Sequence, residues 1–253
     1  MISLKTNDWE INDIETVLFD KDGTFIDLHF FWGQMTELRA NEIIKRFSID
    51  KKYFNKICEI LGYDIYSKKM NKDGITALYS REKIIKIFTK EIKEIGINTT
   101  ENEIEKVFND TNEIFYRNMH EYTKPIKEAI DFIKELSKRK IKIGIVTSDS
   151  VISTQKTLKH FGWENLFQSI IGRESSEYTK ESGEPTKIAL KELNANTKTT
   201  IMIGDAPMDY ISAKNSGIEK TILVATGQIS KNDLLKTSQY TVSSLAEIEI
   251  INE

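Results

Sequence analysis

Short apolar runs alternate with longer amphipathic segments along much of the chain, and this alternation predicts its elements. The first strong strand candidate is residues 16–19, an apolar and β-branched run that stops at the turn-forming residues 20–24. Further strands are expected at 141–146, 169–171, 201–203 and 221–224, with helices at 126–139, 154–161, 185–193 and 207–216, and the tail from residue 230 is expected to add a helix, a short strand at 240–242 and a last helical turn. Strands that alternate with helices predict a parallel sheet with helices on both faces.

Residues 28–123 are predicted to form one helix after another, with a solvated loop between helices at 68–74. Ile84, Ile85, Phe88 and Ile92 recur at helical intervals, and Thr100 with Glu103 forms a capping box for the next helix. About 95 residues replace a connection that is ordinarily about 2–6 residues long. We therefore predict an inserted helical domain at 28–123 and an α/β core at 1–27 and 124–253. Because the insertion follows the C-terminal end of a parallel strand, where open α/β sheets bind ligands, we expect it to act as a lid.

Composition excludes several classes of protein. The 253 residues carry 36 Lys and Arg against 39 Asp and Glu, a formal net charge of −3, so no basic footprint for nucleic acid is visible. The single cysteine, Cys58, excludes an internal disulfide and a Cys-rich zinc site. No apolar run approaches the roughly 18 residues that a spanning helix needs, and the N-terminus has no signal-peptide core. We expect a cytoplasmic protein without membrane or nucleic-acid partners, as a monomer or homodimer.

Polar residues gather where the predicted strands end. In chain order these are Asp20-Lys21-Asp22-Gly23-Thr24, Thr147-Ser148-Asp149, Lys180, and Gly204-Asp205 with Asp209. Asp20, Asp22 and Asp205 would crowd one pocket, where like charges about 4 Å apart repel by roughly 4 kcal/mol at an effective dielectric near 20. A divalent cation would offset this repulsion, and oxygen ligands beside an anionic substrate favour Mg²⁺.

Taken together, these four motifs resemble those of the haloacid dehalogenase-like superfamily, which are Asp-x-Asp-Gly-Thr, Ser/Thr, Lys, and Gly-Asp-x-x-x-Asp. The resemblance covers residues 14–225 of the core, whereas the insertion matches only in position, size and helical character. It implies a Rossmann-like, doubly wound parallel sheet with an inserted helical cap. The subgroup it points to is that of phosphoglycolate phosphatase and β-phosphoglucomutase-like proteins.

The resemblance also implies a role for each motif residue. Asp20 would be the nucleophile that becomes an aspartyl phosphate, and Asp22 the general acid and base. Mg²⁺ would be held by the Asp20 carboxylate, the Asp22 carbonyl and Asp205, while Asp209 orders metal-bound water or Lys180. Thr147, with Ser148 beside it, would bind the phosphate, and Lys180 would balance its charge.

Several of these assignments have rivals in the sequence. The family usually has Lys-Pro-x-Pro, whereas residues 180–185 keep only the later proline, so Lys187 is the alternative to Lys180. Thr147 could instead cap the helix that follows, as could Ser148, Asp149 or Ser150. Asp209 could simply favour the N-terminal end of its helix.

The intact Asp20–Asp22 pair separates the subclasses of the family. Asp22 argues against a dehalogenase, because displacing a halide needs no leaving-group proton. We expect a Mg²⁺-dependent phosphatase acting on a small phosphorylated metabolite. The alternatives are a sugar phosphomutase using the same residues and a non-catalytic phosphate-binding regulatory module. The substrate is not encoded in any motif, because specificity belongs to cap and loop residues.

Overall fold

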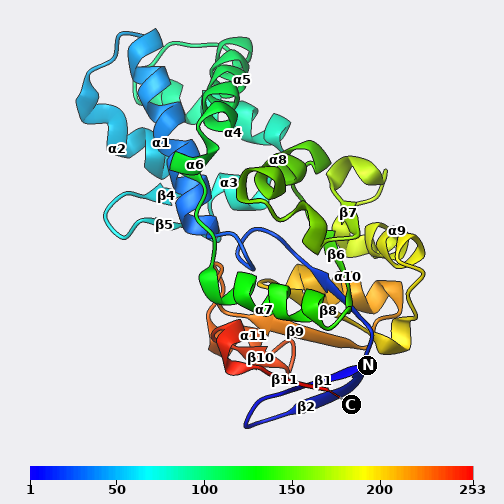
Figure 1. Cartoon of the computed structure of the whole chain (residues 1–253). Coiled ribbons are helices and arrows are strands. Elements are labelled where there is room, and N and C mark those ends of the chain that lie inside the picture. The colour runs from blue at the N-terminus through cyan, green and yellow to red at the C-terminus, as the bar shows by residue number, and fades with distance from the viewer. Residues whose placement is uncertain (253) are drawn as a thin grey trace. The chain divides into compact units, whose positions relative to one another are not determined.

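The chain folds into two compact units, each described here by itself (Figure 1). Met1–Asp27 with Pro125–Glu253 forms the core unit, and Leu28–Lys124 forms the helical unit. The computed structural model describes residues 1–252 and, at residue 120, the backbone alone, so Glu253, the last residue of the expected core, lies outside the described residues. No helix in this described part is long and apolar enough to cross a membrane.

The core unit is built on a six-stranded parallel sheet, which confirms the expected fold class. Its order is β10-β9-β8-β3-β6-β7. The strands are β3 (Thr16–Phe19), β6 (Lys142–Val146), β7 (Ser169–Ile171), β8 (Thr200–Gly204), β9 (Lys220–Val224) and β10 (Thr241–Val242). Strand β3 lies between β6 and β8, with Leu18 opposite both Gly144 and Met202. The segments that follow these three strands therefore emerge at one edge of the sheet.

Helices cover both faces of this sheet because successive side chains of a buried strand point in opposite directions. Leu18 packs in a buried cluster with Ala189 and Ala213 from the helices on one face, whereas the Phe19 ring meets Phe132 edge to face, 6.5 Å between centroids, on the other. The helices of the core are α7 (Lys127–Lys138), α8 (Val151–Phe161), α9 (Glu184–Glu192), α10 (Pro207–Ser216) and α11 (Lys231–Leu234). Short 3-10 turns lie at Glu164–Leu166, Arg173–Ser175, Lys180–Ser182, Thr197–Thr199 and Leu245–Glu247.

The core also contains an antiparallel sheet that the sequence analysis did not predict. Strand β1 (Ile2–Lys5) pairs with both β2 (Glu10–Ile14) and β11 (Glu249–Asn252), so the two ends of the chain lie side by side. The last helical turn that the sequence predicts is present as the 3-10 turn at Leu245–Glu247, and strand β11 follows it. Helix α8 begins three residues earlier than expected, whereas α7 and α9 begin within one residue of their expected starts. Pro125, which precedes α7, forms an isolated bridge with Ile26.

The helical unit has a hydrophobic core of its own. Ile43, Ile57, Phe88 and Phe108 are fully buried there. Its helices are α1 (Leu28–Arg46), a 3-10 turn (Lys51–Tyr53), α2 (Phe54–Ile60), α3 (Ile75–Leu78), α4 (Arg81–Glu94), α5 (Glu101–Arg117) and α6 (Met119–Tyr122). The expected capping box of Thr100 and Glu103 is present at the start of α5. A small hairpin of β4 (Tyr63–Asp64) and β5 (Lys69–Met70) interrupts a stretch that was expected to be helix and loop.

Candidate active site

Asp20 lies directly after β3, buried at the edge of the sheet where β6 and β8 also end. Its backbone N–H donates to the carbonyl of Ile203 in β8 at 2.9 Å, which continues the ladder one residue past the strand. Its side chain accepts a hydrogen bond from Lys180 Nζ at 2.5 Å. Burial raises the pKa of Asp20 to about 7; Lys180 opposes this shift and Asp209 adds to it. The carboxylate is thus desolvated and held by one ammonium group.

Lys180 is the lysine that meets Asp20, because the 3-10 turn at Lys180–Ser182 carries it inward. Its Nζ also lies 2.6 Å from Asp209 Oδ1, and only 7% of the residue is exposed. Burial opposes its charge, but Asp20 and Asp209 together outweigh burial and raise the pKa of Lys180 above its usual value. Lys187, the alternative, lies on the surface and pairs with Glu184 at 2.7 Å. Asp209 accepts from the N–H of Ala206 at 3.0 Å with its other oxygen.

The turn after Asp20 depends on a left-handed glycine. Gly23 has φ +91°, and its N–H donates to the carbonyl of Ile26 at 2.8 Å. Such a φ costs any residue with a Cβ roughly 1–2 kcal/mol. The hydroxyl of Thr226, in the loop after β9, donates to the carbonyl of Gly23 at 2.5 Å and braces the turn. Asp22 is held within this turn, and burial raises its pKa although Lys21 opposes the shift.

Asp205, directly after β8, fills a cradle between two glycines. A Cβ on either Gly23 or Gly227 would collide with its carboxylate. Burial raises the pKa of Asp205 well above its usual range, and repulsion from Asp20 and Asp209 adds to the shift. A buried carboxylate beside another carboxylate is the environment that a cation relieves.

The residues of this site suit a cation that is bound by only a few protein side chains. Among the described side chains, those of residues 1–119 and 121–252, no group of three or more His, Cys, Asp or Glu could hold a metal. A site of two carboxylates, Asp20 and Asp205, with one backbone carbonyl remains compatible with this finding, because Mg²⁺ is commonly held by one or two carboxylates, retained waters and substrate oxygens.

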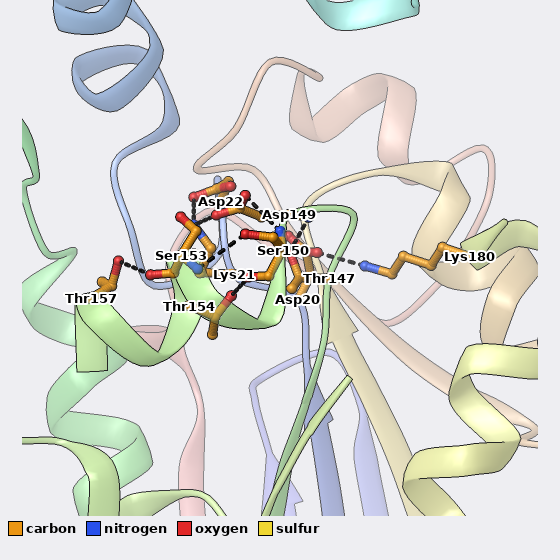
Figure 2. A network of polar contacts seen from close by, with 10 residues as sticks. All are labelled: Asp20, Lys21, Asp22, Thr147, Asp149, Ser150, Ser153, Thr154, Thr157 and Lys180. Carbon is orange, nitrogen blue, oxygen red and sulfur yellow. Dashed lines mark hydrogen bonds and ion pairs between the residues drawn. The ribbon is translucent and has the colours of Figure 1, made fainter. Parts of the chain in front are cut away.

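Thr147, Ser148 and Ser150 have different positions in the loop that follows β6. Ser150 is the residue that caps α8, since its hydroxyl accepts from the N–H of Ser153 at 3.0 Å. Thr147 is buried, and its hydroxyl accepts from the N–H of Asp149 at 3.1 Å (Figure 2). Ser148 is exposed, with its hydroxyl 3.8 Å from the sulfur of Met208. Thr147 thus lies at the strand end without serving as the cap.

A comparison of the sequence with models of known protein families identifies the family of this chain. The family model of the haloacid dehalogenase-like hydrolases matches residues 14–217, which is most of the chain. The chain belongs to this family. The resemblance noted from the motifs is thereby confirmed, and so is the expected class of enzyme, a phosphatase of the haloacid dehalogenase-like hydrolase family.

Relatives and solved structures agree with this membership. The curated protein named "Putative pyrophosphatase PpaX" from Caldanaerobacter subterraneus subsp. tengcongensis is 27% identical over 208 residues, which are 81% of this chain and 79% of the relative. A crystal structure of a predicted phosphoglycolate phosphatase from Haemophilus somnus 129pt has a TM-score of 0.70 at 15% identity and covers 94% of this chain and 97% of its own. A "putative beta-phosphoglucomutase" from Thermotoga maritima has a TM-score of 0.68 at 15% identity and covers 92% and 96%. At such identities the two structures show the fold alone.

The sequence predicts no catalytic or binding role for two polar residues in this haloacid dehalogenase-like site, Lys21 and Asp149. Lys21, between the two motif aspartates, is fully buried, and its ammonium contacts Asp22 and Asp149. From the sequence, Asp149 is a candidate only for a helix cap. The available signal was a lysine between two aspartates, two residues after a buried strand, because lysines are almost never fully buried unless they are paired.

Proposed function

We propose that this phosphatase is Mg²⁺-dependent and hydrolyses a small phosphorylated metabolite through an aspartyl phosphate on Asp20. The observation that carries the proposal is the buried Asp20 carboxylate, hydrogen-bonded to Lys180 at 2.5 Å and close enough to Asp205 to raise that residue's pKa. Five aspartates and two lysines gather at these strand ends, so a phosphate would meet an excess of negative charge without a cation. The Asp20 and Asp205 carboxylates with the Asp22 carbonyl would hold Mg²⁺, which would offset charge on the phosphate.

In the first half of the reaction, an oxygen of Asp20 would attack phosphorus while the bond from phosphorus to the leaving oxygen breaks. Asp22 would donate its proton to that oxygen, and its raised pKa favours the protonated form that this step needs. In the second half, water would attack the phosphorus of the aspartyl phosphate and give a proton to Asp22. Inorganic phosphate would leave, and Asp20 would return to a free carboxylate.

The remaining residues would bind and orient the phosphate. Lys180 would balance charge that builds on the phosphoryl oxygens, and Asp209 would keep its ammonium aimed at Asp20. Thr147 would donate its hydroxyl hydrogen to a phosphate oxygen, with Ser148 at the exposed margin. Asp209 could also order water on the metal. The helical unit would serve as the lid, and the cytoplasm is the expected compartment.

Phosphate release from a panel of substrates tests the proposal. We would incubate the purified chain and its Asp20→Asn variant with Mg²⁺ and p-nitrophenyl phosphate, phosphoglycolate, sugar phosphates or inorganic pyrophosphate. Pyrophosphate is included because of the relative named for it. We expect the wild type alone to release phosphate. Isomerised sugar phosphate without phosphate release would instead indicate a phosphomutase, and no turnover of any substrate would favour a binding module.

A further inference from the structure

A second cluster of opposite charges lies beside the one that holds Asp20. Lys21 is 0% exposed, and its Nζ lies 2.5 Å from Asp22 Oδ1 and 3.2 Å from Asp149 Oδ2. Figure 2 shows Lys21 grouped with Asp22 and Asp149, while Lys180 approaches Asp20 from another side. Burying an ammonium group costs several kcal/mol unless opposite charges repay it. The pairing with both carboxylates is therefore what makes a charged Lys21 tolerable in this position.

Both ends of this cluster are anchored to backbone. The carbonyl of Lys21 accepts hydrogen bonds from the N–H groups of Thr24, Phe25 and Ile26, at 3.1 to 3.3 Å, so the residue is the pivot of the turn after β3. Asp149 Oδ1 accepts from the N–H of Ser150 at 2.7 Å.

The loop that carries Asp149 is also held by the segment that follows strand β7. The Asp149 carbonyl accepts from the N–H of Arg173 at 2.9 Å, and Glu174 accepts from the N–H of Val151 at 2.9 Å. A Cβ at Gly172 would collide with the backbone of residues 149–151, so the loop after β7 lies directly against this segment. The backbone around Asp149 is thus held by several contacts, and Lys21 connects Asp149 to Asp22.

Asp20 and Asp22 are thus each joined to a second carboxylate by a different lysine. Lys180 joins Asp20 to Asp209, and Lys21 joins Asp22 to Asp149. We propose that Lys21 and Asp149 form a clamp that positions the Asp22 carboxylate for proton transfer to and from the leaving oxygen and the attacking water. Lys21 contacts Oδ1, so we assign the proton transfer to Oδ2 of Asp22. Lys21 and Asp149 act through Asp22 and are positioning residues. The inference rests on the proposed function, since it assigns a support for the acid and base of that reaction.

Lys21→Met and Asp149→Asn test the clamp, because the first removes the ammonium group at similar length and the second removes a charge at nearly constant shape. The control is Lys236→Met, which removes a surface lysine paired with Asp233 at 2.7 Å in the same unit. We would measure kcat and KM on p-nitrophenyl phosphate, whose leaving group is acidic, and on alkyl phosphates, whose leaving groups need a proton. We expect both clamp variants to lose about tenfold or more in kcat on alkyl phosphates and clearly less on the aryl ester, with KM little changed. The control should match the wild type.

A double-mutant cycle with Asp22→Asn separates a clamp from a merely structural lysine. If Lys21 acts only through Asp22, Lys21→Met should cost little more once Asp22 is already Asn. Additive losses, or equal losses on aryl and alkyl esters, would overturn the clamp. Circular dichroism and thermal melting establish folding, and Asp149→Asn carries the test if Lys21→Met does not fold. A wild type inactive on every ester would instead refute the proposed function, so the two failures are distinguishable.

Discussion

Replacing Asp20 by asparagine separates two properties of this residue, its contact with Lys180 and its proposed attack on phosphorus. Asn keeps the shape and one hydrogen-bond acceptor but is a poor nucleophile. We expect Asp20→Asn to fold normally and to lose turnover by about 10³-fold or more, in line with the loss of a covalent nucleophile. Steady-state phosphate release beside circular dichroism measures both. Wild-type-like release by the folded variant would contradict the mechanism.

Asp22 should reveal its role through the leaving group. Asp22→Asn removes the proposed proton donor, and general acid catalysis contributes typically 10²–10⁴-fold. We expect a loss of this size in kcat on alkyl phosphates and a much smaller loss on p-nitrophenyl phosphate, whose leaving oxygen needs no proton. A series of esters with graded leaving-group acidity measures the difference. An equal loss across the series would count against the assignment.

Metal removal and replacement of Asp205 test whether the activity depends on Mg²⁺. Activity should vanish in EDTA and return with Mg²⁺, and Asp205→Ala should raise the Mg²⁺ concentration needed for half-maximal activity, because it removes one of two proposed carboxylate ligands. Ca²⁺ should bind and inhibit, since it prefers more ligands and longer bonds. Titrating phosphate release against Mg²⁺ for both proteins gives the comparison. Full activity of a chelated, metal-free sample would show that the carboxylate cluster has another purpose.

Among the elements, the turn after β3 can be tested by comparing its Gly23 with Gly162, a glycine that also has a positive φ but lies in different surroundings. Gly23 and Gly162 both have positive φ, +91° and +68°, but a Cβ at Gly23 would strike the Asp205 carboxylate, whereas one at Gly162 meets nothing within 4 Å. We expect Gly162→Ala to cost roughly 1–2 kcal/mol in stability and to leave kinetics unchanged. Gly23→Ala should add a loss of activity and a higher Mg²⁺ requirement. Urea unfolding measures the stability of each variant, and Mg²⁺ titration of phosphate release measures its metal requirement. Identical kinetics in the two variants would contradict the inference that Gly23 leaves room for the Asp205 carboxylate.

Elements that are set by local sequence could be predicted, and those set by distant partners could not. Strand β3 and the capping box at Thr100 follow from short apolar and polar patterns, and both are present. The pairing of β1 with β11 joins the two ends of the chain, and no local pattern identifies such a partner. The same limit applies in the site. Lys180 and Lys187 are both plausible from sequence, and only the turn at residues 180–182 turns Lys180 toward Asp20.

At the scale of the whole molecule, the two connections between the units leave the core side by side. Ile26 pairs with Pro125, and the N–H of Ile126 donates to the carbonyl of Phe25 at 2.9 Å. The first connection begins a few residues after Asp20 in the chain. The second begins at Pro125, which is bridged to Ile26 and so lies beside the first. Two adjacent connections can act together as a hinge, which is the arrangement that a moving lid requires.

Phosphate monoester hydrolysis demands accelerations up to about 10²¹-fold, so a lid that excludes water has a clear physical rationale. We predict that residues 25–28 and 122–125 are the hinges and that the helical unit closes when the site carries a phosphate mimic. Hydrogen exchange with Mg²⁺ and beryllium fluoride, compared with Mg²⁺ alone, should show protection at both hinges and on part of the helical unit. Asp20→Asn, which lacks the carboxylate that the mimic modifies, is the control and should show no such change. Identical exchange in the wild type with and without the mimic, although the mimic demonstrably blocks turnover, would refute the lid.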